Sequence, residues 1–394
     1  MAKLTVKDID LKDKKVIMRV DFNVPCDKRG KITDETRIKE ALPTIKYVLK
    51  HAKKLILMSH LGRPDGKIVE SLRLTEVAKK LSKLLKKPVE KLDDCVGEDI
   101  KKKIEKTPKK IILLENLRFH PQEEKGDENF AKELASLADV YVNDAFGTAH
   151  RAHASTTIIA KYLPSCIGFL MEKELNSLSC ALAPTKPYVV ILGGAKVSDK
   201  IGLIKNLLNK ADKILIGGAM AYTFLKAKGI TVGKSKIEED KLSLAEQLLE
   251  EAKNKNVQIL LPVDHLAVDN IDEPKIKIIT ENESIDDNLI GVDIGPKTIS
   301  LFKKALKDAN TVLWNGPLGI FENNAYAKGT KEIALYLAKL KKAMTIVGGG
   351  DSAAAAKKFG VAKKLCHVST GGGASLEFLE GKELPGIMII PDKK

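Results

Sequence analysis

The sequence predicts an α/β protein made of two doubly wound, parallel-sheet (Rossmann-like) domains, joined by a linker helix and with an open cleft between them. A chain of 394 residues is long for one hydrophobic core and suits two domains. Short apolar runs alternate with longer amphipathic stretches from end to end. Runs this short and continuous are typical of strands buried on both faces, and their alternation with helices is typical of doubly wound sheets.

The apolar runs fall into two groups along the chain. In the first half, the expected strands are 16–20, 55–58, 111–114 and 140–142. In the second half, they are 189–192, 214–216, 259–261, 312–314 and 345–347. Helical spacing of apolar residues between them, as in 242–252, predicts the helices that cover each sheet.

Prolines mark the expected domain boundary. Pro164 ends one block, a helix-like stretch follows, and Pro184 and Pro187 open the next strand. A helix placed between prolines and between two α/β blocks is typical of a linker. We therefore predict an N-terminal domain at 1–168, a linker helix at 169–184, a C-terminal domain at 185–375 and a C-terminal segment at 376–394.

The composition limits the classes of partner. The net charge is +15, but the lysines are dispersed along helix-like stretches, which is typical of solvated helix faces. Aromatic residues make up only 5% of the chain, which disfavours a stacking platform for single-stranded nucleic acid. Five widely spaced cysteines and the lack of an apolar run of membrane length predict a cytoplasmic protein. We expect neither nucleic acid nor a membrane as a partner, although a basic nucleic-acid binder remains the alternative reading.

Polar and basic residues follow the expected strands of the first half. Ligands bind beyond the carboxyl ends of parallel strands, and Arg is suited to bidentate binding of phosphate and carboxylate. The set that we expect to converge on a small polyanion is His60, Arg63, Arg118, His150 and Arg151, with Arg37 near the first strand.

Glycine-rich loops follow the expected strands of the second half. Glycine lets backbone N–H groups approach a ligand closely, and a helix N-terminus favours phosphate. The candidate nucleotide-binding residues are Gly217, Gly218, Asn315, Pro317, Gly349, Gly350, Asp351 and Ser352, with Lys196 and Lys200 placed to reach phosphate oxygens. Asp351 beside Ser352 resembles a magnesium position. One half thus suits a small anion and the other a nucleotide, which predicts transfer between them.

Motifs of three other enzyme classes are incomplete or absent in the sequence. The stretch 229–235 looks like a P-loop but has three residues between its glycines where four are needed, so we interpret it as a turn. A G-x-S-x-G elbow and a G-x-G-x-x-G fingerprint are both lacking, which disfavours a serine hydrolase and a dehydrogenase.

Eight motifs, in order over nearly the whole chain, resemble those of the phosphoglycerate kinase family. They are RVDFNVP at 19–25, SHLGRP at 59–64, ENLRF at 115–119, FGTAHRAH at 146–153, GGAKVSDK at 193–200, WNGP at 314–317, GGGDS at 348–352 and STGGGAS at 369–375. Leu318, where Met is common in the family, is a small departure, and the tail from Gly386 onward is less typical.

The resemblance implies reversible transfer of the acyl phosphate of 1,3-bisphosphoglycerate to MgADP, giving 3-phosphoglycerate and MgATP, by a monomer. It implies that Asp21 and Asn23 contact the hydroxyl and carboxyl end of the acid and that Arg37 lies near the transferring group. It also implies that His60, Arg63, Arg118 and Arg151 hold the distal phosphate, while Glu322 binds the ribose and Gly291 lies by the base. We assign Arg37, Lys196 and Lys200 as catalytic and Asp351 as the metal ligand.

The resemblance further implies how the domains communicate. Glu174 and His367 match positions that the family uses between its domains, and we group Thr370, Gly371, Gly372 and Gly373 with them as a hinge. The C-terminal tail is expected to return to the N-terminal domain. Both reacting partners, a carboxylate and a nucleotide phosphate, are ionised at neutral pH, so no general base is expected.

Overall fold

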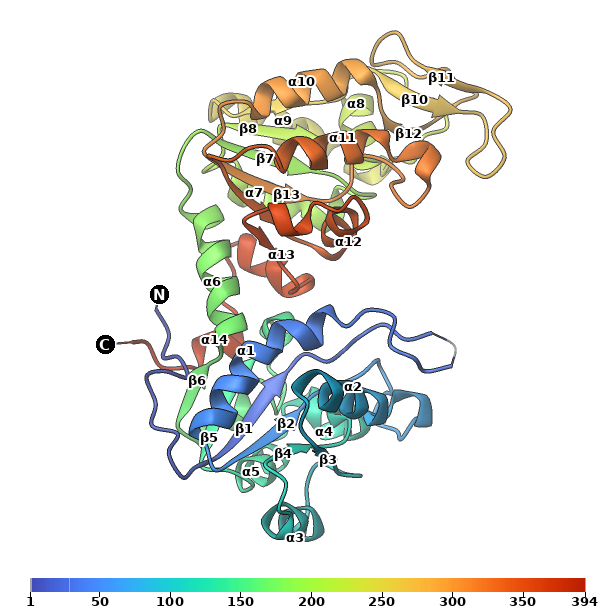
Figure 1. Ribbon diagram of the computed structural model, residues 1–394. Coiled ribbons are helices and arrows are strands. Elements are labelled where there is room, and N and C mark those ends of the chain that lie inside the picture. The colour runs from blue at the N-terminus through green and yellow to red at the C-terminus, as the bar shows by residue number, and fades with distance from the viewer. Residues whose placement is uncertain (1, 28, 394) are drawn as a thin grey trace. The chain divides into compact units, whose positions relative to one another are not determined.

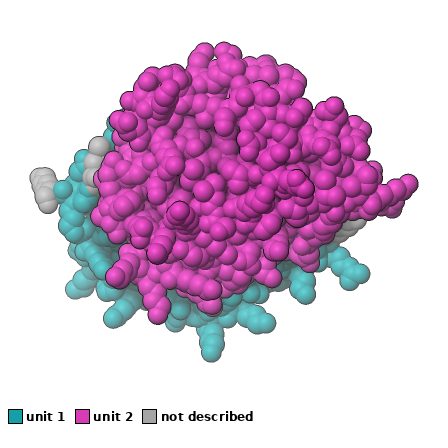
Figure 2. Space-filling model, turned by 90° about the horizontal axis from the view of Figure 1, so that it is seen from above, with its two compact units in different colours: residues 1–175, 383–394 teal, residues 176–382 magenta. Residues whose placement is uncertain are grey.

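Nine of the strands in the structure form around the nine predicted apolar runs. The structure is a computed structural model and describes residues 2–27 and 29–393. The chain divides into two compact units, which comprise residues 1–175 with 383–394 and residues 176–382 (Figure 2). We refer to these as unit 1 and unit 2 and describe each by itself.

Unit 1 contains a six-stranded sheet in the order β3-β4-β2-β1-β5-β6, in which all neighbouring strands are parallel (Figure 1). The strands are β1 (Lys15–Val20), β2 (Lys54–Met58), β3 (Val89–Lys91), β4 (Ile111–Leu113), β5 (Val140–Asp144) and β6 (Ser165–Ile167). Because the strands are parallel, the loops after β1, β2, β4 and β5 leave the sheet at one edge. The predicted anion-binding residues lie in these loops and at the start of the following helix.

Helices and short 3₁₀ turns connect the strands of unit 1. The helices are α1 (Thr36–His51), α2 (Thr75–Leu85), α3 (Glu98–Lys106), α4 (Pro121–Lys125), α5 (Glu128–Ala135) and α14 (Pro385–Met388). The 3₁₀ turns are η1 (Glu70–Leu72), η2 (Leu117–Phe119), η3 (Phe146–Thr148) and η4 (Ile158–Lys161). Val16, Met18 and Val20 pack in the same core cluster as the apolar faces of α1 and α2. Ile17 lies between them in sequence and is also fully buried, so both faces of β1 are covered.

Unit 2 contains a second six-stranded parallel sheet in the order β15-β14-β13-β7-β8-β9. Its strands are β7 (Tyr188–Leu192), β8 (Lys213–Ile216), β9 (Gln258–Leu260), β13 (Thr311–Asn315), β14 (Met344–Val347) and β15 (His367–Val368). Its helices are α7 (Ile201–Leu207), α8 (Met220–Ala227), α9 (Leu242–Asn254), α10 (Pro296–Leu306), α11 (Lys328–Leu337), α12 (Gly350–Lys358) and α13 (Gly373–Leu379). The 3₁₀ turns are η5 (Ser198–Lys200), η6 (Glu239–Lys241), η7 (Asn324–Tyr326) and η8 (Ala362–Lys364). Trp314 on β13 is buried in the main core cluster of this unit.

A small antiparallel sheet in unit 2 was not predicted from the sequence. It has the order β11-β10-β12, with β10 (His265–Val268), β11 (Lys277–Ile279) and β12 (Ile290–Ile294). All three residues of β11 are exposed, so this strand lacks the buried apolar run that identifies the others. The edge strands β3, β6 and β15 were missed because each is short and includes a polar residue, so none forms a continuous apolar run.

A single helix, α6 (Phe169–Leu182), occupies the segment between the two sheets, and the boundary between the compact units falls within it. The last residues of the chain pack in unit 1 against its beginning. The backbone N–H of Leu4 donates to the Pro391 carbonyl at 3.0 Å, and the buried Lys3 ammonium pairs with Asp392 at 2.8 Å. Residues 376–382, which we grouped with this segment, lie in unit 2 instead. Among the described residues, no helix is long and apolar enough to cross a membrane.

Candidate active site

Arg37 is held rigidly at the end of β1. Asp21 follows the strand, and Arg37 is the second residue of α1. One guanidinium nitrogen, Nη1, donates to Asp21 Oδ2 at 2.8 Å and to the Asn23 carbonyl at 3.1 Å. The ion pair sets the direction of the guanidinium and leaves its other N–H groups for an anion.

Hydrogen bonds tie together the loops that follow three neighbouring strands. Gly62 N–H donates to Asn23 Oδ1 at 2.9 Å, and Phe22 N–H donates to the Ser59 hydroxyl at 2.9 Å. Arg118, in the 3₁₀ turn η2, donates from Nη1 to the Gly62 carbonyl at 2.8 Å. The loops after β1, β2 and β4 therefore form one connected edge.

His60 is a neutral hydrogen-bond donor at this edge. It is buried, and burial together with the nearby Arg19, Arg118 and Arg37 guanidiniums holds its pKa well below the ordinary value. Arg19 Nη2 lies 3.1 Å from His60 Nδ1. Because a guanidinium can only donate, Nδ1 accepts and the ring proton resides on Nε2, which can donate to an anion.

Arg19 is a residue of this site that sequence reasoning missed. It lies within β1 and is 1% exposed, and its Nε donates to the Ser155 hydroxyl at 2.9 Å. Ser155 in turn donates to the buried Glu123 carboxylate at 2.6 Å, which compensates the buried charge. A lone Arg inside an apolar strand run was the available signal, because such a charge requires buried partners.

Positive charge is concentrated around Arg118. Arg118 is 6% exposed, and burial, Arg19 and Arg151 lower its pKa against the opposing effect of Glu124, whose carboxylate lies 3.2 Å from Nε. The pKa of the buried His153 falls to about 3, through burial first and then through Arg118, Arg19, Arg151 and His150. Arg118, His150, Arg151 and His153 therefore lie within electrostatic range of one another. An anion would relieve the repulsion between the guanidiniums of this group.

Arg63 differs from the rest of the predicted anion-binding set. It is exposed, and it makes no hydrogen bond or ion pair with any residue that the structure describes. The structure thus brings together Asp21, Asn23, Arg37, His60, Arg118, His150 and Arg151, and the exposed Arg63, in the loop after β2, is accessible to an anion.

Three of the glycine loops of unit 2 pack directly on one another. Gly193 N–H donates to the Asn315 carbonyl and Gly194 N–H to the Pro317 carbonyl, each at 2.9 Å. A Cβ at Gly218, whose φ is +67°, would lie 2.7 Å from the Gly194 backbone. At these positions glycine is needed for loop packing, whether or not a ligand is bound. A Cβ on Gly217 would likewise meet Leu318 at 2.6 Å.

Lys200 is a partly buried cation beside the loop after β13. Its Nζ donates to the Asn315 side-chain oxygen, and Asn315 Nδ2 donates to the Gly348 carbonyl at 2.9 Å. Burial lowers the pKa of Lys200 to about 8, while Asp351 and Asp199 act in the opposite direction. Lys196, on the same loop, is exposed.

The N-terminus of α12 is open to a ligand. A Cβ at Gly350 would meet no atom within 4 Å, so the first turn of this nine-residue helix is accessible. The buried Ser352 hydroxyl accepts from Gly316 N–H at 2.5 Å and is engaged in fixing the loops. The accessible amide end can bind an anionic group, while Asp351, the acidic residue of the first turn, is exposed.

Asp351 suits a magnesium ion that arrives with a nucleotide. Mg²⁺ usually takes one or two protein carboxylates and completes its shell with phosphate oxygens and water. One exposed carboxylate beside an open helix N-terminus fits that pattern. When bound, the ion would neutralise charge on the phosphates.

The remaining predicted residues of unit 2 are spread over several elements. Glu322 is exposed, and its carbonyl accepts from Lys358 Nζ at 2.9 Å. Gly291 lies on β12, where a Cβ would meet the Tyr222 hydroxyl at 2.1 Å. Of the predicted hinge residues, Glu174 is in α6, His367 begins β15, Thr370, Gly371 and Gly372 link β15 to α13, and Gly373 begins α13.

Glu238 is a second residue that sequence reasoning missed. Its carboxylate accepts from Val197 N–H at 2.6 Å and from Ser198 N–H at 3.1 Å, at the turn that carries Lys200. It lies about forty positions from its partners, so the local sequence gives no signal for this role.

Comparisons with known proteins identify the family of the chain. The sequence model of the family described as phosphoglycerate kinase matches residues 6–382. The phosphoglycerate kinases of Dictyoglomus turgidum and Pseudothermotoga lettingae are 56% identical over 398 residues and 57% identical over 397 residues, with 100% of each chain covered. The solved phosphoglycerate kinase structures from Coxiella burnetii and Pyrococcus horikoshii have TM-scores of 0.88 and 0.81 and identities of 42% and 33%, each with 98% of both chains covered. The chain belongs to the phosphoglycerate kinase family.

Proposed function

We propose that this phosphotransferase uses the basic edge of unit 1 to hold the phosphoglycerate and the open end of α12 in unit 2 to hold MgADP or MgATP. The reaction is the reversible transfer of the acyl phosphate of 1,3-bisphosphoglycerate to ADP. Two observations support the proposal. In unit 1, Asp21 orients the Arg37 guanidinium, and in unit 2, the partly buried Lys200 ammonium donates to Asn315 at the end of a strand.

In unit 1, different residues bind different parts of the acid. Arg63, Arg118 and Arg151 bind the distal phosphate of the acid, and the neutral His60 donates to it from Nε2. Asp21 and Asn23 bind the hydroxyl and carboxyl end. Arg37 is thereby directed at the transferring phosphoryl group, because Asp21 already fixes its orientation.

On the nucleotide side, Lys200 lies near the moving phosphoryl group and Asp351 holds the metal that accompanies the nucleotide. The α12 N-terminus binds phosphate through its amide groups. Phosphoryl transfer spreads negative charge over the equatorial oxygens, so fixed positive groups stabilise the transition state. Both nucleophiles are ionised at neutral pH, and hence no residue of the chain needs to remove a proton.

Direct transfer also requires both units to contribute to one reaction centre. We propose that the units close over the two bound substrates and exclude water, which would otherwise hydrolyse the acyl phosphate. Small-angle scattering should show compaction with both substrates bound and none with either alone. An unchanged radius of gyration with both bound would contradict closure.

The decisive experiment is MgATP-dependent phosphorylation of 3-phosphoglycerate, read through coupled reduction of the 1,3-bisphosphoglycerate that forms. Turnover should vanish without magnesium and collapse in Arg37→Ala. Full turnover in Arg37→Ala would refute the assignment of that residue. No turnover from folded protein that still binds MgADP would refute the assignment of the acid.

We also propose that the enzyme acts as a monomer in the cytoplasm. Each unit has its own apolar core and its own set of candidate ligands, so one chain carries a complete set of site residues. Sedimentation equilibrium should give a mass near 43.1 kDa. A concentration-dependent dimer would contradict the proposal.

A further inference from the structure

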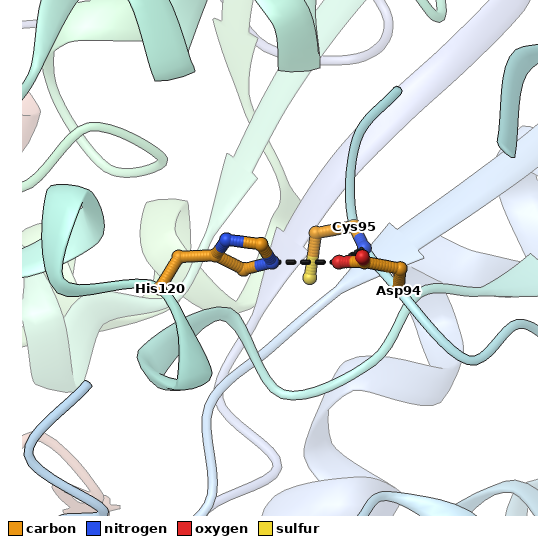
Figure 3. A group of neighbouring side chains, drawn as sticks. All are labelled: Asp94, Cys95 and His120. Carbon is orange, nitrogen blue, oxygen red and sulfur yellow. Dashed lines mark hydrogen bonds and ion pairs between the residues drawn. The ribbon is translucent and has the colours of Figure 1, made fainter. Parts of the chain in front are cut away.

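A cluster of three metal-binding side chains lies in unit 1, outside the residues assigned to the transfer reaction. Asp94 and Cys95 follow β3, and His120 follows the 3₁₀ turn η2. One ligand atom from each residue lies within 4.8 Å of the other two. Figure 3 shows the thiol pointing toward the hydrogen bond that joins His120 Nε2 to Asp94 Oδ1 at 2.6 Å.

The arrangement does not suit a catalytic cysteine. A nucleophilic thiol is activated by an imidazole that takes its proton. Here, the Cys95 thiol donates to the Glu115 carbonyl at 3.0 Å, while the imidazole nitrogen Nε2 faces Asp94. Cys95 is also fully buried. A residue without access to a substrate and without a base cannot carry out nucleophilic chemistry.

The ligand types identify the class of ion. We propose that Asp94, Cys95 and His120 form a binding site for a thiophilic divalent cation, with zinc as the best match. Thiolate, imidazole and carboxylate together are a zinc ligand set, and three protein ligands leave the fourth tetrahedral position to water. Binding would break the hydrogen bond from the Cys95 thiol to the Glu115 carbonyl and release the thiol proton to solvent. The resulting thiolate and the Asp94 carboxylate would then balance the charge of a divalent ion.

The distances are compatible with small rearrangements. Tetrahedral zinc with bonds of about 2.0–2.3 Å places its ligand atoms about 3.3–3.6 Å apart. The Nε2–Oδ1 pair must therefore open from 2.6 Å, and the sulfur must approach the other two ligand atoms by up to about 1.3 Å. The His120 and Asp94 side chains are 25% and 53% exposed, which gives both of them room to rotate, whereas the Cys95 thiol is buried.

The nearby Glu115 carboxylate does not belong to the proposed metal site. The Glu115 carboxylate is already engaged by Arg73 at 2.9 Å, by Lys91 and by Leu74 N–H at 3.0 Å. It is therefore not available as a fourth ligand. His120 lies two positions after Arg118, so an ion would join the turn that carries this arginine to the segment after β3. Binding does not depend on the transferase activity.

The test is a titration of the chelator-treated full-length protein with Co²⁺ and Zn²⁺. Co²⁺ should bind with one-to-one stoichiometry and produce the near-ultraviolet thiolate-to-cobalt charge-transfer band, and Zn²⁺ should displace it. Cys95→Ala should abolish the band and lower the affinity at least about 100-fold, since ligand loss exceeds the 10–100-fold cost of an outer-shell change. His120→Gln, on a partly exposed side chain, should lower the affinity similarly without disturbing the core.

Two matched variants separate the site from adventitious binding. Cys366→Ala and His51→Gln each remove an exposed potential ligand elsewhere on the chain and should leave the titration unchanged. A charge-transfer band that survives Cys95→Ala but is lost in Cys366→Ala would overturn the proposal and indicate an adventitious ion only. Absence of any one-to-one Co²⁺ complex in the folded parent protein would overturn it as well.

Discussion

The lowered pKa of Lys200 predicts a measurable pH dependence of the stability of unit 2. Burial lowers its folded pKa from 10.5 to about 8. In the unfolded chain the lysine should titrate near its ordinary value, so between about pH 8 and about pH 10.5 the unfolded state binds more protons. Stability must then rise with pH across that window. At neutral pH the buried ammonium lowers the free energy of unfolding by about 3 kcal/mol, and partial exposure of the side chain reduces this effect.

The perturbation is Lys200→Met, which keeps an apolar stem and removes the titrating group. Linkage with the two pKa values predicts that the parent protein gains about 2 kcal/mol relative to the variant between about pH 7 and about pH 9.5. Partial exposure makes about 1–2 kcal/mol the expected range. The absolute effect at pH 7 also includes the lost hydrogen bond to Asn315, and for this reason the difference between the two pH values is the quantity to compare.

Trp314 makes the measurement specific for unit 2. It is the only tryptophan, and it is buried in β13 beside Asn315. Urea unfolding followed by its fluorescence at the two pH values gives the free energies. Lys196→Met, on an exposed side chain of the same loop, is the matched control and should show no pH-dependent difference. If Lys200→Met and the parent respond identically to pH, the buried-ammonium explanation is refuted.

Three further predictions follow from packing and charge. Arg118→Lys loses the planar fork, and KM for 3-phosphoglycerate should rise about 10–100-fold with kcat largely kept, as steady-state kinetics will show. Gly218→Ala should destabilise unit 2 by about 2 kcal/mol or more, and Gly229→Ala, with positive φ but open space, by only about 1 kcal/mol in the same Trp314 assay. Ile390→Ala removes a buried side chain of the C-terminal tail and should lower the free energy of unfolding of unit 1 by about 2–5 kcal/mol. Thermal unfolding measures the change, and an unchanged melting temperature would contradict docking of the tail on unit 1.

Most strands of the two parallel sheets could be predicted because they are buried on both faces, although β9 is only partly buried. Runs such as 189–192 are continuous and apolar, and each of the nine predicted runs corresponds to a strand. The antiparallel sheet could not be predicted in the same way, because β11 is exposed and its two Ile residues stand beside Lys277. Pairing of β11 with β10 is a tertiary contact, and local sequence carries little information about it.

Candidate site residues could be proposed from the sequence where a basic residue follows a predicted strand. Arg118 and Lys200 follow β4 and β7, and Arg37 lies at the start of α1, the helix after β1. Arg19 and Glu238 act by supporting other groups, and their partners Ser155 and Ser198 lie 136 and 40 positions away. Only the fold brings such pairs together, so a single sequence cannot identify them without a model of the sheet edge.

The glycine loops show that one sequence pattern can have more than one physical cause. Their number in the second half indicated a nucleotide site, on the argument that glycine admits a ligand. In the structure, Gly193, Gly217 and Gly218 are constrained by neighbouring loops, whereas Gly350 has open space. Close packing of the loops fixes the sheet edge, and the open helix end can then receive phosphate on a rigid support. Substitution should therefore separate the two classes: alanine at Gly218 should lower stability, while a larger side chain at Gly350 should lower nucleotide affinity in a protein that still folds.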